Sequence, residues 1–224
     1  MTDASAEGRD GGAAARWAVV IPVKPAARGK SRLVVPGVDR VTLARAIALD
    51  TIEAVAACEV VDRVIVVGDD GGLVLGAVGI PGLRLVPEPS PGGLDAAIAA
   101  GIAVADERTP RAALLGDLPA LRPPDLAAAL RAAATVARAA VADADGTGTT
   151  LLTAAPGVAW TSAFGDGSFA RHRALGAVPL PVTDASTLRH DVDTADQLET
   201  AAALGLGPRT AALWRVDHRV RPVA

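Results

Sequence analysis

Aromatic side chains and cysteine are scarce in this 224-residue sequence, which has three tryptophans, two phenylalanines, no tyrosine and one cysteine. One thiol excludes a disulfide framework and a cysteine-based metal site. Because Cys58 falls in an alanine-rich stretch, we expect a buried structural thiol there. A core made mostly of Ala, Val and Leu needs close contacts between small side chains, as helices packed on a sheet provide.

Two further absences concern charge and long apolar runs. A formal net charge of −3 gives no basic field, which argues against a general nucleic-acid binder. No apolar run approaches the ~20 residues that span a bilayer, and residues 1–16 lack the apolar stretch of a signal peptide. We therefore expect a cytoplasmic protein without nucleic-acid or membrane partners. The expected organisation is a disordered tail at 1–16, one domain at 17–215 and a C-terminal tail at 216–224.

Apolar runs alternate with amphipathic stretches along the chain. Alternation of this kind indicates an α/β fold with a mostly parallel, doubly wound sheet. Thr42 is the expected N-cap of the first helix, and Thr194 with Gln197 matches a capping box. The pattern predicts strands at 17–23, 64–67, 83–86, 112–115 and 150–154, and helices at 42–57, 94–105, 124–136, 168–175 and 195–204.

A basic loop follows the first predicted strand, with Lys24, Arg28, Lys30 and Arg32 close together. Open α/β sheets bind ligands at the carboxyl ends of their strands. A solvated charged loop is the alternative, but this position favours a grip on the triphosphate of a nucleotide. Lys24, Lys30 and Arg32 are therefore candidate catalytic and nucleotide-binding residues.

The same loop carries only half of a known phosphate-binding motif. Gly29-Lys30-Ser31 matches the end of G-x-x-x-x-G-K-[ST], whose first glycine would fall at residue 24. Lys24 stands there and puts a bulky side chain where that motif needs a permissive backbone. We therefore expect basic side chains, rather than a ring of backbone amides, to hold the phosphates.

Three aspartates are candidate ligands of Mg²⁺, which prefers carboxylate oxygens. Asp117 follows a predicted strand, where a turn-capping role is the alternative. Asp191 and Asp193 are two residues apart, so an extended backbone would put both carboxylates on one face. Asp193 could instead cap the helix that follows it.

Two loops rich in small residues, Gly146–Thr150 and Phe164–Ser168, offer backbone N–H groups and hydroxyls. Such groups suit a carboxylate or phosphate oxygen, although ordinary turns have the same composition. His172 follows the second loop and could be an anion donor or a surface residue.

Taken in order, these segments resemble one protein family, the 2-phospho-L-lactate / phosphoenolpyruvate guanylyltransferases of coenzyme F-420 biosynthesis. Single motifs are modest, but the ordered set is specific and runs from about Trp17 to Thr210. The motifs are Val-Ile-Pro-Val-Lys24, Lys30-Ser-Arg-Leu33, Gly-Gly-Leu-Asp-Ala-Ala-Ile98, Gly-Asp117-Leu-Pro-Ala-Leu121, Gly-Thr-Gly-Thr149, Phe-Gly165-Asp-Gly-Ser168-Phe-Ala-Arg-His172 and Asp191-Val-Asp-Thr194.

The resemblance implies a GT-A-like, Rossmann-related nucleotidyltransferase. A phosphorylated three-carbon acid would attack the α-phosphorus of GTP and release pyrophosphate, and the product could pass to the downstream pathway transferase. Actinobacterial members use phosphoenolpyruvate and archaeal ones 2-phospho-L-lactate; the Ala- and Arg-rich composition favours the former. By motif position, Thr149, Gly165 and Ser168 would contact the acid, Asp117, Asp191 and Asp193 would bind Mg²⁺, and Lys24 and Lys30 match the basic loop.

The chain departs from the family at Asp95, where Asn is common. If this position contacts guanine, a carboxylate can still accept from the N1–H and N2–H₂ donors, so Asp95 is a candidate nucleotide-binding residue. Three other functions stay open. A sugar-phosphate or molybdenum-cofactor nucleotidyltransferase would carry a Gly-rich loop in place of Pro22-Val-Lys24. Lys24 disfavours a P-loop kinase, and a non-catalytic nucleotide sensor would leave the aspartates without a purpose.

Overall fold

The computed structural model describes residues 16–24, 30, 32–68, 71–77 and 79–220. Arg28, Gly29 and Ser31 of the basic loop lie outside the described residues, as do most of the predicted N-terminal tail and residues 221–224. The strands are β1 (Trp17–Pro22), β2 (Val61–Val67), β3 (Leu83–Val86), β4 (Arg111–Leu114), β5 (Arg138–Ala142), β6 (Thr149–Ala154) and β7 (Val178–Pro179). The helices are α1 (Arg40–Ala56), α2 (Gly71–Gly76), α3 (Leu94–Ala103), α4 (Pro123–Ala133), α5 (Ser168–Ala174), the 3₁₀ turn η1 (Thr187–Arg189), α6 (Ala195–Leu204) and α7 (Pro208–Val220).

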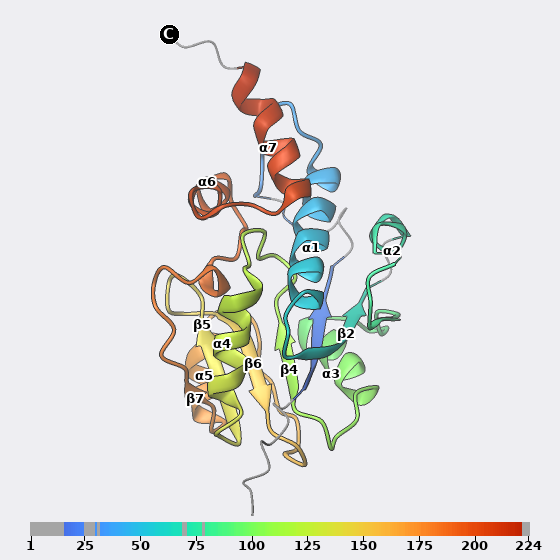
Figure 1. Ribbon diagram of the computed structural model, residues 1–224, viewed down its shortest axis with the longest axis vertical. Helices are drawn as coiled ribbons and strands as arrows, with labels where there is room; N and C mark the ends of the chain where they lie inside the picture. The colour runs from blue at the N-terminus through green and yellow to red at the C-terminus, as the bar shows by residue number, and fades with distance from the viewer. Residues whose placement is uncertain (1–15, 25–29, 31, 69–70, 78, 221–224) are drawn as a thin grey trace, which may run out of the picture.

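The strands form one seven-stranded sheet in the order β3-β2-β1-β4-β6-β5-β7 (Figure 1). β1 pairs in parallel with β2 and β4, and β2 pairs in parallel with β3. β6 runs antiparallel to β4 and β5, whereas the short β7 is parallel to β5. The predicted mostly parallel, doubly wound α/β fold is confirmed. Because β6 is reversed, it begins at the sheet edge where β1 and β4 end.

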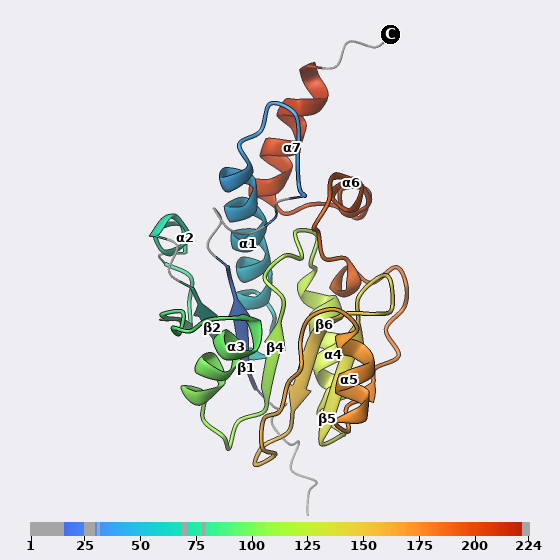
Figure 2. The same ribbon diagram turned by 180° about the vertical axis from the view of Figure 1, so that it is seen from behind.

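Helices cover both faces of this sheet, with α1 and α4 on one face and α3 and α5 on the other (Figures 1 and 2). β1 is buried on both faces: Val19 and Ile21 join the core under α1 and α4, and Val20 joins the core under α3. The layers approach closely, because a Cβ on Gly101 of α3 would collide with the Val20 side chain. The small-residue composition thus matches the close helix-on-sheet packing it predicts.

Two helix starts test the capping predictions. The N-cap of α1 is Asp39, whose Oδ2 accepts the Thr42 backbone N–H at 2.8 Å and its hydroxyl at 2.7 Å. The expectation that Thr42 is the cap was wrong, because Thr42 lies in the first turn and donates to the cap. The capping box of Thr194 and Gln197 at the start of α6 is confirmed.

The sequence pattern missed α2, β5, β7, η1 and α7. α7 packs along α1, and its first turn is held by Asp50 of α1, which accepts from the backbone N–H groups of Arg209 and Thr210 at 3.1 and 2.7 Å. The predicted boundary between residues 215 and 216 falls inside α7. In the part of the chain that the structure describes, no helix has the length and apolar character to cross a membrane.

Candidate active site

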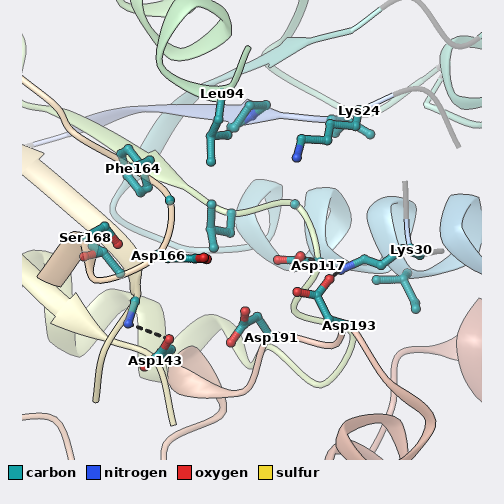
Figure 3. Close-up of a pocket in the computed structure, with 18 of the residues that line it drawn as sticks. Lys24, Lys30, Leu94, Asp117, Asp143, Phe164, Asp166, Ser168, Asp191 and Asp193 are labelled. Atoms are coloured by element: carbon teal, nitrogen blue, oxygen red, sulfur yellow. Dashed lines mark hydrogen bonds and ion pairs between the residues drawn. The ribbon is translucent and has the colours of Figure 1, made fainter. Parts of the chain in front are cut away.

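A pocket of about 490 Å³ opens at the sheet edge where β1 and β4 end and β6 begins. Ligand sites of open α/β sheets lie at this edge, and sites for small molecules measure about 300–1,000 Å³. Figure 3 shows lysines at one end of the pocket, the Ser168 loop at the other and aspartates between them. The predicted site residues that line it are Lys24, Lys30, Arg32, Asp117, Thr149, Gly165, Ser168, Asp191 and Asp193.

The backbone brings the three predicted metal ligands together. The Val192 N–H donates to the carbonyl oxygen of Asp117 at 3.0 Å. Val192 itself is fully buried, so Asp191 and Asp193 on either side of it face the pocket, as extended-chain alternation requires. A Cβ on Gly116 would lie only 3.1 Å from the Pro22 carbonyl oxygen, and this close approach sets Asp117 beside the basic loop.

Lys30 joins two of these carboxylates. Its Nζ lies 2.5 Å from Asp117 Oδ2 and 2.9 Å from Asp193 Oδ1. Burial opposes the positive charge, but Asp117 and Asp193 outweigh it and raise the pKa of the Lys30 ammonium. Burial would raise the pKa of Asp193, whereas the attraction of Lys30 lowers it overall. The ammonium is therefore fixed as a cation among the acidic groups.

Among the described residues, Asp191 is the one of the three carboxylates that forms no ion pair with Lys30 or another cation. Burial, followed by repulsion from Asp117 and Asp143, raises the pKa of Asp191 to about 7, although Lys30 acts in the opposite direction. Asp117 Oδ1 is buried and has no hydrogen-bond partner among the described residues. Both features identify a place where negative charge lacks compensation, which a bound cation would supply.

Within the described residues, no group of His, Cys, Asp or Glu side chains is already arranged around a metal position. The donor set nevertheless fits Mg²⁺, which binds one or two carboxylates together with substrate phosphates and water. The N-cap of α6 is Thr194, not Asp193. The carboxylate of Asp193 faces Lys30 instead. The alternative of a purely capping Asp193 was therefore wrong.

At the other end of the pocket, Asp143 shapes the loop that precedes β6. Its carboxylate oxygens accept from the Thr147 and Gly148 N–H groups at 2.9 and 2.7 Å. A Cβ on Gly148 would collide with this carboxylate. Asp143 lies outside the motifs that indicate the site, although an Asp a few residues before a Gly-rich turn is a recognised local signal. Asp143 therefore lines the pocket and fixes the backbone of the loop that leads to Thr149.

Arg171 shapes the second loop. Its Nε, Nη1 and Nη2 donate to the carbonyl oxygens of Ala163, Asp166 and Phe164 at 3.0, 2.5 and 3.3 Å. Gly165 has φ +107°, a conformation that side chains rarely adopt. The guanidinium thus gathers three carbonyls on one side of the loop, whose other side lines the pocket together with Ser168.

His172 is buried and has both ring nitrogens engaged. Nδ1 lies 2.9 Å from Thr149 Oγ1, and Nε2 lies 3.0 Å from the Ala163 backbone nitrogen. The Phe164 ring meets the imidazole edge-on, with ring centroids 4.7 Å apart. The two expected roles, surface residue and direct anion donor, were therefore both wrong; His172 holds neighbouring groups in place.

Asp95 lies beside the pocket and is not among its lining residues. Its Oδ1 accepts from the Phe164 N–H at 3.2 Å. The structure thus gives this position a supporting contact, which either an aspartate or an asparagine oxygen can make. The nucleotide contact expected at Asp95 stays a prediction, and the Asn that is common in the family could accept the same Phe164 N–H.

Comparison with solved structures identifies the fold. A nucleotidyl transferase from Methanothermobacter thermautotroptrophicus superimposes with a TM-score of 0.59 and 18% identity, covering 84% of this chain and 97% of that one. Rv0371c from Mycobacterium tuberculosis H37Rv, solved as a complex with manganese, gives a TM-score of 0.50 at 20% identity over 84% and 98% of the two chains. The chain has the nucleotidyltransferase fold.

The sequence comparison then gives the family. The family described as "Guanylyl transferase CofC like" matches residues 17–212. The phosphoenolpyruvate guanylyltransferase of Thermomonospora curvata is 49% identical over 201 residues, which are 88% of each chain. The chain therefore belongs to the CofC-like guanylyl transferase family, as the ordered motifs indicate.

Proposed function

We propose that this chain transfers the guanylyl group of GTP to phosphoenolpyruvate, forming enolpyruvoyl-2-diphospho-5'-guanosine and pyrophosphate for coenzyme F-420 biosynthesis. Its similarity to relatives that bear the name phosphoenolpyruvate guanylyltransferase supports this acid over 2-phospho-L-lactate. The observation that carries the proposal is the division of one pocket into a lysine end and an end with hydroxyls and backbone N–H groups, with the carboxylates of aspartates between them.

The two ends suit two different anions. Lys24, Lys30 and Arg32 would hold the triphosphate of GTP and stabilise the pyrophosphate as it leaves. Thr149, Gly165 and Ser168 would hold the three-carbon acid with short, neutral donors that do not demand a second cluster of cations. A phosphate oxygen of the acid then attacks the α-phosphorus while the bond from that phosphorus to the oxygen of the β-phosphate breaks.

This attack needs no general base, because the attacking phosphate oxygen is already ionised. The principal barrier is the approach of two anions, so positioned positive charge should dominate the rate enhancement. Asp117, Asp191 and Asp193 would hold Mg²⁺, which supplies part of that charge and neutralises the phosphates when it is bound. The manganese complex of a protein with the same fold supports the use of a divalent cation.

A nucleotidyltransferase of another specificity, acting on a sugar phosphate or a molybdenum cofactor, is the alternative. A matrix of the four nucleoside triphosphates against phosphoenolpyruvate, 2-phospholactate and a sugar 1-phosphate separates the two, with pyrophosphate release as the readout. We expect release with GTP and phosphoenolpyruvate to exceed every other pair. Faster release with the sugar phosphate would contradict the proposal.

A further inference from the structure

The contacts of His172 decide which way the Thr149 hydroxyl can donate. His172 is 1% exposed and Thr149 is 2% exposed, so water does not compete freely for either group. Nε2 of the ring faces the Ala163 backbone N–H, which can only donate. Nε2 must therefore be the unprotonated, accepting nitrogen, and a neutral ring then carries its hydrogen on Nδ1.

The ring is neutral under ordinary conditions. Burial lowers the pKa of His172 to about 4; Asp95 acts against this change and Arg171 adds to it. Phe164 packs edge-on against the ring and contributes no charge. With its hydrogen on Nδ1, the imidazole donates to Thr149 Oγ1 across 2.9 Å.

A threonine hydroxyl has one hydrogen to donate. Because Oγ1 of Thr149 accepts from the His172 ring, the hydroxyl hydrogen stays available for a different partner, and Thr149 lines the pocket. We infer that His172 is a positioning residue that commits the Thr149 hydroxyl to donate to an anionic oxygen of the three-carbon acid. This inference rests on the proposed function, which puts the acid at Thr149.

The second contact of the ring has a different purpose. The bond from the Ala163 N–H restrains the start of the Phe164–Ser168 loop, which Arg171 and Asp95 also hold. Loss of the Ala163 contact therefore leaves the loop with other restraints, whereas the bond to Thr149 is the one described contact that sets the direction of its hydroxyl. The two nitrogens can be separated by substitution.

Two amide variants make that separation. In His172→Asn the side-chain amide can reach the Nδ1 position and donate to Thr149, but it cannot reach Ala163. In His172→Gln the longer amide can accept from the Ala163 N–H at the Nε2 position, but it loses the donor to Thr149. A positioning role predicts that KM for phosphoenolpyruvate rises about tenfold in the Gln variant, as for one lost hydrogen bond, and changes less than threefold in the Asn variant.

The GTP side supplies the internal control. KM for GTP should stay within twofold in both variants, because Lys24 and Lys30 lie at the other end of the pocket. In a Thr149→Val background, His172→Gln should add no further increase in KM for the acid, since the hydroxyl it orients is gone. Equal losses in the Asn and Gln variants, or parallel increases in both KM values, would show a merely structural role and overturn the inference.

A measurement on the unmodified protein keeps the test independent of activity. The sequence has three histidines, so the ring nitrogens can be resolved by ¹⁵N NMR, with His172→Asn for assignment. We expect a protonated Nδ1 and an unprotonated Nε2 for His172 from pH 5.5 to 8. A protonated Nε2 would overturn the inference even if the enzyme is active. Correct protonation without guanylyl transfer to the acid would instead refute the proposed function.

Discussion

The two ends of the pocket are built in opposite ways. The lysine end is a network of full charges, in which the Lys30 ammonium bridges Asp117 and Asp193 while Asp191 has an elevated pKa of about 7. At the other end, the Thr149 hydroxyl has a neutral hydrogen bond to His172, which burial keeps uncharged. The charged Asp143 and Arg171 contact the loop backbone there rather than Thr149.

This difference indicates how each end would meet its ligand. Charged groups that neutralise one another can exchange partners when a cation and a triphosphate arrive, because each ion pair lost is replaced by another. Backbone and hydroxyl donors fixed in advance need no such exchange and bind an anion with little reorganisation. Changes at the charged end should therefore affect turnover, and changes at the neutral end should affect KM for the acid.

The largest effect is expected at the charged end, from Asp117→Ala. Loss of this carboxylate removes a proposed Mg²⁺ ligand and leaves Lys30 with one acidic partner, so turnover should fall by at least ~10³-fold. Steady-state pyrophosphate release measures it. The matched control is the exposed Asp106, which pairs with Arg108 in the segment before β4, whereas Asp117 follows the end of that strand. Asp106→Ala should retain activity. Near-full activity of Asp117→Ala would refute the metal role.

Lys30→Met should lower turnover by ~10²-fold, since a positioned cation at the leaving phosphates is lost. It should also destabilise the metal-free protein, because Asp117 and Asp193 then repel one another without a partner. Thermal unfolding with EDTA and with Mg²⁺ checks this pair of effects. Mg²⁺ should raise the melting temperature of Lys30→Met more than that of the unmodified protein, because the Lys30 ammonium no longer occupies the same carboxylates. Equal shifts would contradict competition between Lys30 and Mg²⁺ for Asp117 and Asp193.

Acid should lower the free energy of unfolding through protonation of His172 at the neutral end of the pocket. The pKa of its ring is about 4 in the folded protein and 6.5 ordinarily, so the unfolded chain binds the proton more readily. The stability this ring contributes is therefore complete above pH 6.5 and is lost as the pH falls from 6.5 to 4, by roughly 3 kcal/mol in total.

Urea unfolding of the unmodified protein and of His172→Asn between pH 4 and 7.5 isolates this contribution. The contribution of Asp191 to the pH dependence of stability has the opposite sign. Its pKa is raised in the folded protein, so the stability it contributes decreases as the pH increases. That effect is common to both proteins and cancels in their difference. A difference in unfolding free energy that does not vary with pH would contradict a neutral buried ring.

A smaller change is expected from Arg171→Lys. A lysine cannot reproduce a guanidinium that donates to three carbonyls at once. The loop should loosen, with a rise of ~fivefold in KM for the acid and none in KM for GTP. The exposed neighbour Arg173 offers a control of the same charge, and Arg173→Lys should be silent. A change in KM for GTP alone would show that the loop belongs to the nucleotide side.

The smallest effect is expected from Asp95→Asn. The amide oxygen can still accept the Phe164 N–H, so both KM values should change by less than twofold. Asp95→Ala removes the acceptor and should raise KM for the acid severalfold. If Asp95→Asn alters the preference for GTP over other nucleotides, this side chain contacts the base after all.

Local patterns were sufficient for five strands of the sheet, β1, β2, β3, β4 and β6, and for the acidic cluster. β1 is a continuous apolar run, α6 begins with its own capping box, and Asp117 follows an apolar strand at the ligand-binding edge. The spacing of Asp191 and Asp193 also placed both carboxylates on one face. In each case the residues that decide the structure are neighbours in sequence.

Other features depend on contacts between distant residues. The first turn of α7 is held by Asp50 of α1, which is far away in sequence. β5 is an alanine-rich segment whose composition favours a helix. β5 is a strand because it pairs with β6 and β7. His172 is buried because Thr149, Ala163 and Phe164 close around it, which no spacing in the sequence indicates.

The most direct test of the central claim follows the oxygen atoms of the reaction. Phosphoenolpyruvate with ¹⁸O in the three terminal phosphate oxygens is incubated with GTP, Mg²⁺ and the enzyme, and the products are analysed by mass spectrometry. Attack of the acid on the α-phosphorus predicts a guanylylated product that retains all three ¹⁸O atoms and pyrophosphate that contains none. Appearance of GDP or GMP in place of that product, or of ¹⁸O in pyrophosphate, would contradict the account.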